Sequence, residues 1–191
     1  MANATYNPLI IGRSLRKNTL HCCQQHDYPY FSNVYYLVID RFFDKNNANN
    51  FQVSDLSIDS KLKFHGGDLS GVIRKVSNGY FDRLGINNIL LSPLHTNPDS
   101  ASRESKMPLK KKMGFDGTWP IDGRSIDSRF GKEENLRLLV NTAHKKDIGI
   151  YLELIIGHTH MKHPLYQSNP DWYNLANYNY GDVFLPMLDL S

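Results

Sequence analysis

The sequence predicts an α/β fold with a parallel β-sheet, and three observations support this prediction. Residues 150–156 form a nearly unbroken apolar run of strand length, which is typical of a parallel strand covered on both faces. Residues 34–39 and 86–91 have the same apolar and β-branched character. Between these two runs, residues 69–84 repeat apolar side chains near the helical period. A strand, a helix and a second strand in this order form a βαβ unit, in which the two strands are parallel.

The composition is that of an ordinary globular domain. A chain of 191 residues is long enough for one well-buried domain, and a hydrophobic content of 40% does not indicate disorder. The net charge of +3 is small and dispersed, and the lysine run at 110–112 is typical of a solvated loop, so we expect no nucleic-acid partner. No apolar stretch approaches the length of a membrane span, so we expect no membrane partner.

Residues 1–32 show no sustained periodicity, and we expect an irregular N-terminal arm before a domain at 33–191. The two cysteines, Cys22 and Cys23, are adjacent in sequence and cannot form an ordinary disulfide across the fold. The arm lacks an apolar core of signal-peptide length. A cytoplasmic protein is therefore the default expectation, with secretion as the open alternative.

Within the first βαβ unit, polar residues follow each strand. The first strand ends at Asp40 and Arg41, and the helix is expected to end at Gly85 with a break near Gly79. After the second strand, residues 95–113 have the composition of a long polar loop. Loops at this end of a parallel strand often carry ligand contacts.

A second amphipathic helix is expected over residues 132–146, with four apolar residues on one face: Leu136, Leu139, Val140 and Ala143. The third strand follows this helix and ends in Gly157 and His158. Because α/β folds place their chemistry at the carboxyl ends of parallel strands, His158 is a candidate functional residue. Residues 159–191 contain no further strand with a following helix.

Six sequence motifs occur in an order that a known family shares: 35–42, 64–71, 84–93, 114–119, 127–131 and 153–158. Together they resemble the α-amylase family of glycoside hydrolases, whose catalytic domain is a (β/α)8 barrel, also called a TIM barrel. The resemblance implies a partial TIM barrel, covering roughly strands 1 to 3 with their helices and long βα loops. This part is shorter than a closed barrel, which usually needs about 250 residues.

The resemblance also implies retaining hydrolysis or transfer at α-glucosidic bonds, by a carboxylate nucleophile and a carboxylic acid about 5 Å apart. In the family, the carboxylates follow the fourth, fifth and seventh strands, beyond the three strands matched here. Residues 123–127, Gly-Arg-Ser-Ile-Asp, resemble the Gly-x-Arg-x-Asp nucleophile motif in the spacing of Gly and Asp, although the Arg is one position early and no apolar strand precedes them. We therefore expect an N-terminal fragment of an enzyme acting on α-1,4-glucans, inactive alone, with a C-terminal half as the implied partner.

Three positions depart from the family pattern. Glu153 stands where the family usually has Asp, Gly157 where it has Asn, and Met187 where it has an Asp that binds calcium beside the active centre. Because neither Gly157 nor Met187 has a side-chain oxygen, that calcium site is expected to be absent. These departures keep an alternative open, a non-catalytic calcium- or carbohydrate-binding derivative or a gene remnant without activity.

The resemblance implies three substrate-binding residues. His158 matches the family histidine that hydrogen-bonds the sugar, although a histidine at a strand end is otherwise often structural. Asp116 lies where the family has His or Asp and is expected to reach the sugar. Thr118 replaces an aromatic residue that stacks on the sugar ring in many members, and Trp119 either compensates for this loss or belongs to the core.

The asparagine-rich loop resembles a calcium site of cyclodextrin glycosyltransferases. The implied ligands are side-chain oxygens and one backbone carbonyl, that of Gly66: Asp44, Asn46, Asn49, Asn50, Gly66 and Asp68. Such a set of oxygen ligands with two negative charges suits Ca²⁺. The alternative is a flexible polar loop in which Asp68 only caps the helix that follows it.

Overall fold

The structure is a computed structural model that describes residues 33–50, 57–104, 107–180 and 183–188. The expected N-terminal arm, with Cys22 and Cys23, lies outside the described residues, as does the side chain of Met187. No helix in the described part of the chain is both long enough and apolar enough to span a membrane.

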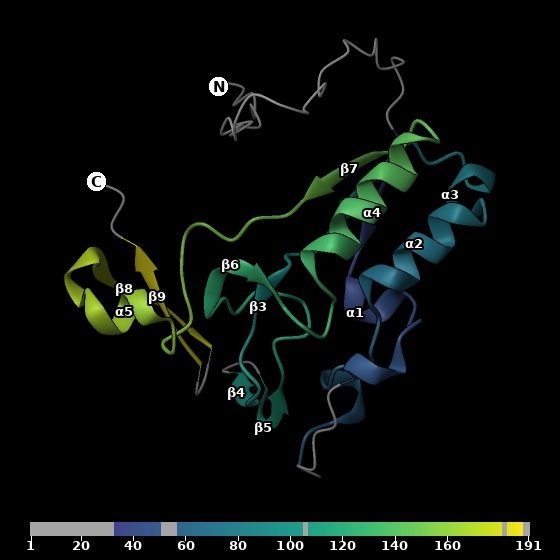
Figure 1. Ribbon diagram of the computed structural model, residues 1–191. Helices are drawn as coiled ribbons and strands as arrows, with labels where there is room; N and C mark the ends of the chain where they lie inside the picture. The colour runs from purple at the N-terminus through teal and green to yellow at the C-terminus, as the bar shows by residue number, and fades with distance from the viewer. Residues whose placement is uncertain (1–32, 51–56, 105–106, 181–182, 189–191) are drawn as a thin grey trace, which may run out of the picture. The chain divides into compact units, whose positions relative to one another are not determined.

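Three parallel strands form the central sheet in the order β1–β2–β7 (Figure 1). They are β1 (Val34–Leu37), β2 (Asn88–Leu91) and β7 (Gly149–Leu152). Leu91 is in register with Leu37 on one side and with Leu152 on the other. The three predicted strands and their parallel arrangement are therefore confirmed, and their order along the sheet follows their order in the chain.

Helices cover one face of this sheet. They are α2 (Leu69–Ser77), α3 (Tyr80–Arg83) and α4 (Glu133–His144). The predicted break lies between α2 and α3, where Gly79 has a φ of 75°, in the left-handed region that favours glycine. Leu139 and Ala143 of α4 are buried, which confirms the apolar face predicted for this helix. Figure 1 shows α2 and α4 side by side.

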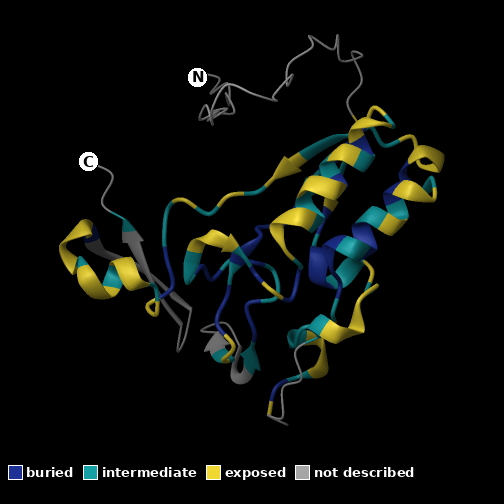
Figure 2. Cartoon of the chain, viewed as in Figure 1, coloured by how far each residue is buried: buried dark blue, intermediate teal, exposed yellow. Residues whose placement is uncertain are grey.

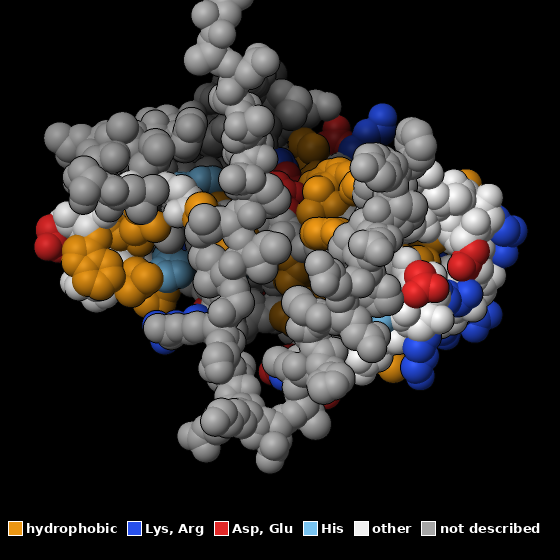
Figure 3. Space-filling view, turned by 90° about the horizontal axis from the view of Figure 1, so that it is seen from above, with side chains coloured by type: hydrophobic (Ala, Val, Ile, Leu, Met, Phe, Trp, Pro, Cys, Tyr) orange, Lys and Arg blue, Asp and Glu red, His pale blue; other side chains and the backbone are white. Residues whose placement is uncertain are grey.

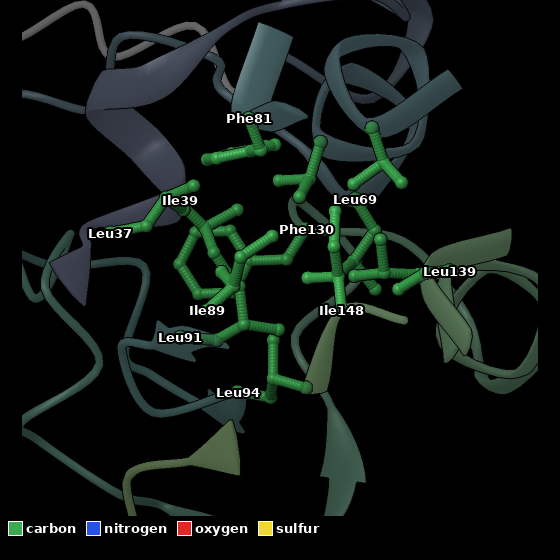
Figure 4. Close-up of a cluster of buried hydrophobic side chains, with 13 residues drawn as sticks. Leu37, Ile39, Leu69, Phe81, Ile89, Leu91, Leu94, Phe130, Leu139 and Ile148 are labelled. Atoms are coloured by element: carbon green, nitrogen blue, oxygen red, sulfur yellow. The ribbon is translucent and has the colours of Figure 1, made fainter. Parts of the chain in front are cut away.

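The hydrophobic core lies between the helices and the sheet (Figure 4). Alternate sheet residues point into it, among them Leu37, Ile89 and Leu91. Phe81 is fully buried, with its ring 5.1 to 5.7 Å from the rings of three aromatic residues: Tyr35, Phe42 and Tyr80. A mutually packed aromatic cluster of this kind contributes beyond the area that it buries.

The other face and the β7 edge are open in the described structure (Figure 2). Tyr36 is 52% exposed on β1, and Leu152, Leu154 and Ile156 are 49%, 60% and 65% exposed. Hydrophobic side chains also lie open on the face seen in Figure 3. The prediction of a strand through residue 156 covered on both faces was wrong, because β7 is an edge strand that ends at Leu152, and β2 ends at Leu91, which offers the sheet's last carbonyl to Glu153.

The long loop expected at 95–113 instead contains short antiparallel strands. β4 (Ser102–Glu104) pairs with β5 (Met107–Lys112), and β3 (His95–Thr96) pairs with β6 (Asp122–Ile126). The polar sequence does not predict these antiparallel strand pairs. Short pairs of this kind depend on backbone hydrogen bonds more than on an apolar face, so they leave no alternating apolar pattern. The remaining elements are α1 (Ile39–Phe42), η1 (Asn47–Asn49), η2 (Ser60–Leu62), α5 (Pro164–Ser168), η3 (Pro170–Trp172), β8 (Tyr173–Tyr180) and β9 (Val183–Leu188).

Candidate functional site

The carboxyl ends of the three parallel strands are joined by hydrogen bonds. Ser92, directly after β2, donates its backbone N–H to the Leu37 carbonyl at 2.9 Å, and its hydroxyl accepts the Ile39 N–H at 3.2 Å. Glu153, directly after β7, donates its N–H to the last carbonyl of β2 at 3.0 Å. In parallel α/β folds this end of the sheet is where ligands bind, so the side chains here are the candidates for function.

Asp40, at the end of β1, organises the segment that precedes α2. Its buried carboxylate accepts the His65 N–H at 2.9 Å and the Gly66 N–H at 3.1 Å, and its carbonyl accepts the Gly67 N–H at 2.9 Å. Burial raises the pKa of Asp40, although the backbone hydrogen bonds act in the opposite direction. These contacts fasten residues 65–67 to the strand end.

Asp68 connects the start of α2 to the asparagine-rich loop. One carboxylate oxygen accepts the Gly71 N–H at 2.6 Å as the helix N-cap, and the other accepts the Asn46 N–H at 2.8 Å. Its role as a cap is confirmed, and the same side chain also holds the loop. Because Asp68 is only 1% exposed, both sets of contacts are shielded from water.

Two amide oxygens in the asparagine-rich loop, those of Asn49 and Asn50, are buried without a hydrogen-bond partner among the residues that the structure describes. Both amide nitrogens are engaged, Asn49 with the Arg129 carbonyl at 2.8 Å and Asn50 with an Asp44 carboxylate oxygen at 2.6 Å. Asn50 lies against Gly66, where a Cβ would come within 2.5 Å of its amide oxygen. A buried acceptor without a donor costs about 1–3 kcal/mol, which a cation or water would offset.

The six residues expected to bind calcium form two groups of contacts. Asp44 contacts Asn50, which lies against Gly66. The Asn46 N–H donates to Asp68, and the Asn46 carbonyl accepts the Asn49 N–H at 3.2 Å. The described residues contain no group of three or more His, Cys, Asp or Glu suited to a metal. A cation in this loop would therefore depend on amide and backbone oxygens beside two carboxylates, a donor set that Ca²⁺ accepts and that Zn²⁺ does not favour.

Asp116 and His158 are linked through Thr118. An Asp116 carboxylate oxygen accepts the Thr118 hydroxyl at 2.8 Å, and His158 Nε2 is 3.0 Å from the Thr118 carbonyl. The segment passes over the end of β2, because Gly117 lies so close to it that a Cβ would come 2.2 Å from the Pro93 carbonyl. Two of the three residues expected to bind sugar therefore both contact Thr118, and residues 116–118 together with His158 are called the Asp116–His158 strip below.

A tyrosine and a glutamate pair across the open face of the sheet. The Tyr36 hydroxyl donates to a Glu153 carboxylate oxygen at 3.0 Å. Partial burial, with smaller contributions from Glu153 and Asp116, raises the pKa of Tyr36 to about 12, so the hydroxyl stays a neutral donor. Sequence reasoning missed Tyr36, because its partner lies 117 residues away in the chain.

Trp119, the third residue expected to bind sugar, is only 3% exposed. Its backbone N–H donates to the Asn97 side chain at 2.9 Å, and its ring stacks on that of His160 with 6.3 Å between centroids. His160 is itself buried, which lowers its pKa to about 4, with a smaller contribution from Lys162. Of the two alternatives for Trp119, this burial supports packing beneath the site.

A buried ion pair, Asp127–Arg129, fixes the connection into α4. Asp127 is 1% exposed and accepts two hydrogen bonds from the Arg129 guanidinium, at 2.7 and 2.5 Å. Asn97 hydrogen-bonds both members of the pair. Its backbone N–H donates to the Asp127 carboxylate, and its backbone carbonyl accepts from the Arg129 guanidinium. A carboxylate engaged in this way is a structural anchor, which agrees with rejecting the nucleophile-like spelling of residues 123–127.

A model of the α-amylase catalytic domain matches residues 36–185, which is most of the chain. The chain belongs to the α-amylase family. The similar proteins include a cyclomaltodextrin glucanotransferase from Paenibacillus macerans, 31% identical over 153 residues, and an α-amylase from Niallia circulans, 30% identical over 129 residues. These alignments cover 78% and 66% of this chain but only 21% and 24% of the two relatives. The matched part of this chain therefore corresponds to less than a quarter of the length of each relative.

Solved structures agree with this membership. An α-amylase from Geobacillus thermoleovorans, complexed with acarbose, is 26% identical with a TM-score of 0.61, and an Anoxybacillus α-amylase is 27% identical with a TM-score of 0.63. Each match covers 83% of this chain, and 33% and 34% of those chains respectively. The fold is accordingly a partial TIM barrel, with a parallel sheet that does not close within the described residues.

Proposed function

We propose that this chain forms the first three strands of an α-amylase-type barrel that acts on α-glucans, and that it binds the glucan without cleaving it alone. The observation that carries the proposal is the convergence of Asp116 and His158, through Thr118, at the strand ends. Hydrolysis needs a nucleophile and a general acid. The family motifs that supply them follow later strands than the three matched here, and Asp127 is sequestered by Arg129.

The chemistry of the strip fits a neutral, hydroxyl-rich ligand. The strip contains a carboxylate, that of Asp116, which only accepts hydrogen bonds, and an imidazole, that of His158, which can donate or accept. Trp119, by contrast, is too buried to stack on a sugar ring, and we propose that it supports the strip from below. Recognition therefore depends on hydrogen bonds more than on stacking.

Titration of the full chain with maltotriose, followed by NMR or calorimetry, tests this function. We expect saturable binding that Asp116→Asn and His158→Gln each weaken, while a reducing-sugar assay with starch stays at background. Lys146→Met is a matched control, because Lys146 pairs with Asp82 on an exposed surface. Release of reducing sugar by the chain alone would contradict the proposal that it binds glucan without cleaving it. Absence of maltotriose binding would contradict the proposed binding site at Asp116 and His158.

We further propose that the asparagine-rich loop binds one Ca²⁺ through the six residues expected from the sequence: Asp44, Asn46, Asn49, Asn50, Gly66 and Asp68. The two unpartnered amide oxygens of Asn49 and Asn50 support a cation there. When bound, the ion would hold the loop against residues 65–68. It takes no part in the chemistry of the sugar.

A thermal-shift titration tests the calcium proposal. Ca²⁺ at a hundred times its dissociation constant would stabilise the fold by about 2.7 kcal/mol, and the same concentration of Mg²⁺ should stabilise it less, because Mg²⁺ gives up its water reluctantly. Asp44→Asn should abolish the Ca²⁺ shift while changing the unfolding temperature in EDTA only slightly. An unchanged unfolding temperature at millimolar Ca²⁺ would reject the site.

The open β7 edge supports a polypeptide partner that supplies the remaining strands. Gly149 and Glu153 direct their N–H groups to β2, so the N–H groups of Ile150 and Leu152 point to the other side of the strand. Exposed Leu152 and Leu154 flank that edge. A parallel strand followed by a helix would pair with the backbone and cover these side chains.

A further inference from the structure

Three histidine rings accept backbone N–H groups from residues 153–165, which connect β7 to the first turn of α5 and carry His158. These residues are called the connecting segment below. The hydrogen bonds form three pairs of backbone donor and ring acceptor: Ile155 to His95 Nε2 at 3.4 Å, Lys162 to His160 Nδ1 at 3.1 Å, and Leu165 to His163 Nδ1 at 3.1 Å. A ring nitrogen accepts a hydrogen bond only while it carries no proton. All three contacts therefore require a neutral imidazole.

His160 links the connecting segment to the proposed sugar site. Its backbone N–H donates to the Pro120 carbonyl at 2.9 Å, and its ring stacks on Trp119. Two residues earlier in each strand of chain, His158 Nε2 lies 3.0 Å from the Thr118 carbonyl. Because the two contacts are neighbours along both segments, a displacement of His160 would also move His158 away from Thr118.

Burial keeps the three rings neutral. His160 and His95 are 2% and 8% exposed, and burial lowers the pKa of all three histidines, that of His160 to about 4. Charged side chains of β6 and of the segment itself act on the rings: Asp122 on His95 and His163, Arg124 on His163, and Lys162 on His160. The aspartate favours protonation and the two basic side chains oppose it.

We propose that His95, His160 and His163 position the connecting segment, and that their protonation in acid releases the segment and withdraws His158 from the sugar site. This inference rests on the proposed function and adds a control by pH to the same site. A protonated imidazole carries N–H on both nitrogens, so each ring would then direct an N–H at a backbone N–H. The apolar core beneath α2 and α4 contains no such contact and should stay folded.

The direction of the effect follows from the protons that each state binds. In the released segment His160 would regain the ordinary histidine pKa of about 6.5, so the released state takes up a proton first as the pH falls. Between pH 7.5 and pH 4.5 the equilibrium should shift toward release more than tenfold through His160 alone. The alternative is that the histidines only stabilise the whole fold, in which case acid would expose the segment and the core together.

Amide hydrogen exchange of the full chain at pH 7.5 and pH 4.5, expressed as protection factors, distinguishes local release from global unfolding. We expect the protection of the Ile155 and Lys162 amides to fall more than tenfold at pH 4.5, while that of Val72 and Leu139 in the core stays unchanged. Maltotriose affinity should fall over the same pH interval.

Two variants keep an acceptor that does not titrate. His160→Asn places an amide oxygen near the position of Nδ1, so the Lys162 amide should stay protected at pH 4.5. His163→Asn does the same for Leu165 at the N-cap of α5, where asparagine is favoured, and serves if the first variant does not fold. His144→Asn is the matched control, because His144 is exposed at the end of α4, and its pH dependence should equal that of the unaltered chain.

Three results would overturn the inference: unchanged protection of Ile155 and Lys162 at pH 4.5, an equal loss of protection at Val72 and Leu139, or full pH dependence of the Lys162 amide in a folded His160→Asn variant. Failure to bind maltotriose at pH 7.5 would instead reject the proposed function. The protection factors are measured without sugar, so they test the release of the segment independently.

Discussion

The helix-covered side of the sheet and the strand-end region are held together by different forces. On the helix side the buried residues are apolar, with Phe81, Leu139 and Val72 fully inaccessible. At the strand ends the buried residues are largely polar or charged: Asp40, Ser92, His95, Asn97, Asp127, Arg129 and His160. The first region depends on packing volume, and the second on hydrogen bonds and protonation states, so the two should respond to different perturbations.

Phe81→Ala should cause the largest loss of stability. Removing a fully buried ring from the aromatic cluster costs about 3–5 kcal/mol, and the loss should be the same at pH 7.5 and pH 5. Leu138→Ala on α4 is the control, because Leu138 is 53% exposed and its truncation should cost less than about 0.5 kcal/mol. Urea unfolding measures both. Equal effects of the two variants would contradict the assignment of the core.

Acidification should weaken the strand-end region through His160. The usual histidine pKa is about 6.5, and burial lowers that of His160 to about 4 in the folded chain. The unfolded chain therefore takes up a proton first as the pH falls. The resulting stability is complete above pH 6.5 and is lost as the pH approaches 4, by roughly 3 kcal/mol in total.

His160→Gln should reduce the difference in unfolding free energy between pH 7.5 and pH 4.5, as measured by urea unfolding at both values. Other groups, such as His95 with its lowered pKa, titrate in both proteins and cancel in the comparison. An identical pH dependence in the variant and the unaltered chain would show that His160 is not held neutral.

Asp68→Ala should have an intermediate effect, because it removes the N-cap of α2 and the contact with Asn46. Loss of a cap costs about 0.5–2 kcal/mol. Asp68→Ser keeps an acceptor for the Gly71 N–H and should recover most of this stability in EDTA. With Ca²⁺ present, the Ser variant should still show a smaller thermal shift than the unaltered chain, which separates the cap from the proposed ligand.

Leu154→Lys should have the smallest effect on stability, within about 0.5 kcal/mol, because Leu154 is 60% exposed beyond the end of β7. Its expected effect is on association instead. An exposed apolar edge favours contact between copies, and a charge there opposes it. Light scattering after size-exclusion chromatography should show less self-association for the variant, and a large fall in unfolding free energy would mean that this edge is covered.

The strands and helices of the βαβ units could be predicted because their apolar periods are strong and local. The break at Gly79 was visible for the same reason, since a positive φ favours glycine. The antiparallel pairs within 95–126 were not predicted, because polar hairpins lack an apolar pattern. The extent of β7 was overestimated, since a sequence run cannot reveal that the neighbouring strand ends at Leu91.

The residues of the candidate site were predictable only where a motif carried them, as for Asp116 and His158. Lys112 was interpreted as part of a solvated run, and its contact with Asp116 depends on how β5 meets the following segment. The Asp127–Arg129 pair has a local spacing, but its burial depends on Asn97, which is distant in sequence. Side chains that act through tertiary contacts leave little trace in a single sequence.

The most direct test of the central claim is an NMR titration of the full chain with maltotriose. The account predicts saturable chemical-shift changes centred on residues 112–119 and 158, lost in Asp116→Asn, with no cleavage of the sugar. Shift changes that do not saturate, or that persist unchanged in Asp116→Asn, would contradict the claim that the strand ends of this α-amylase family chain form a glucan-binding site.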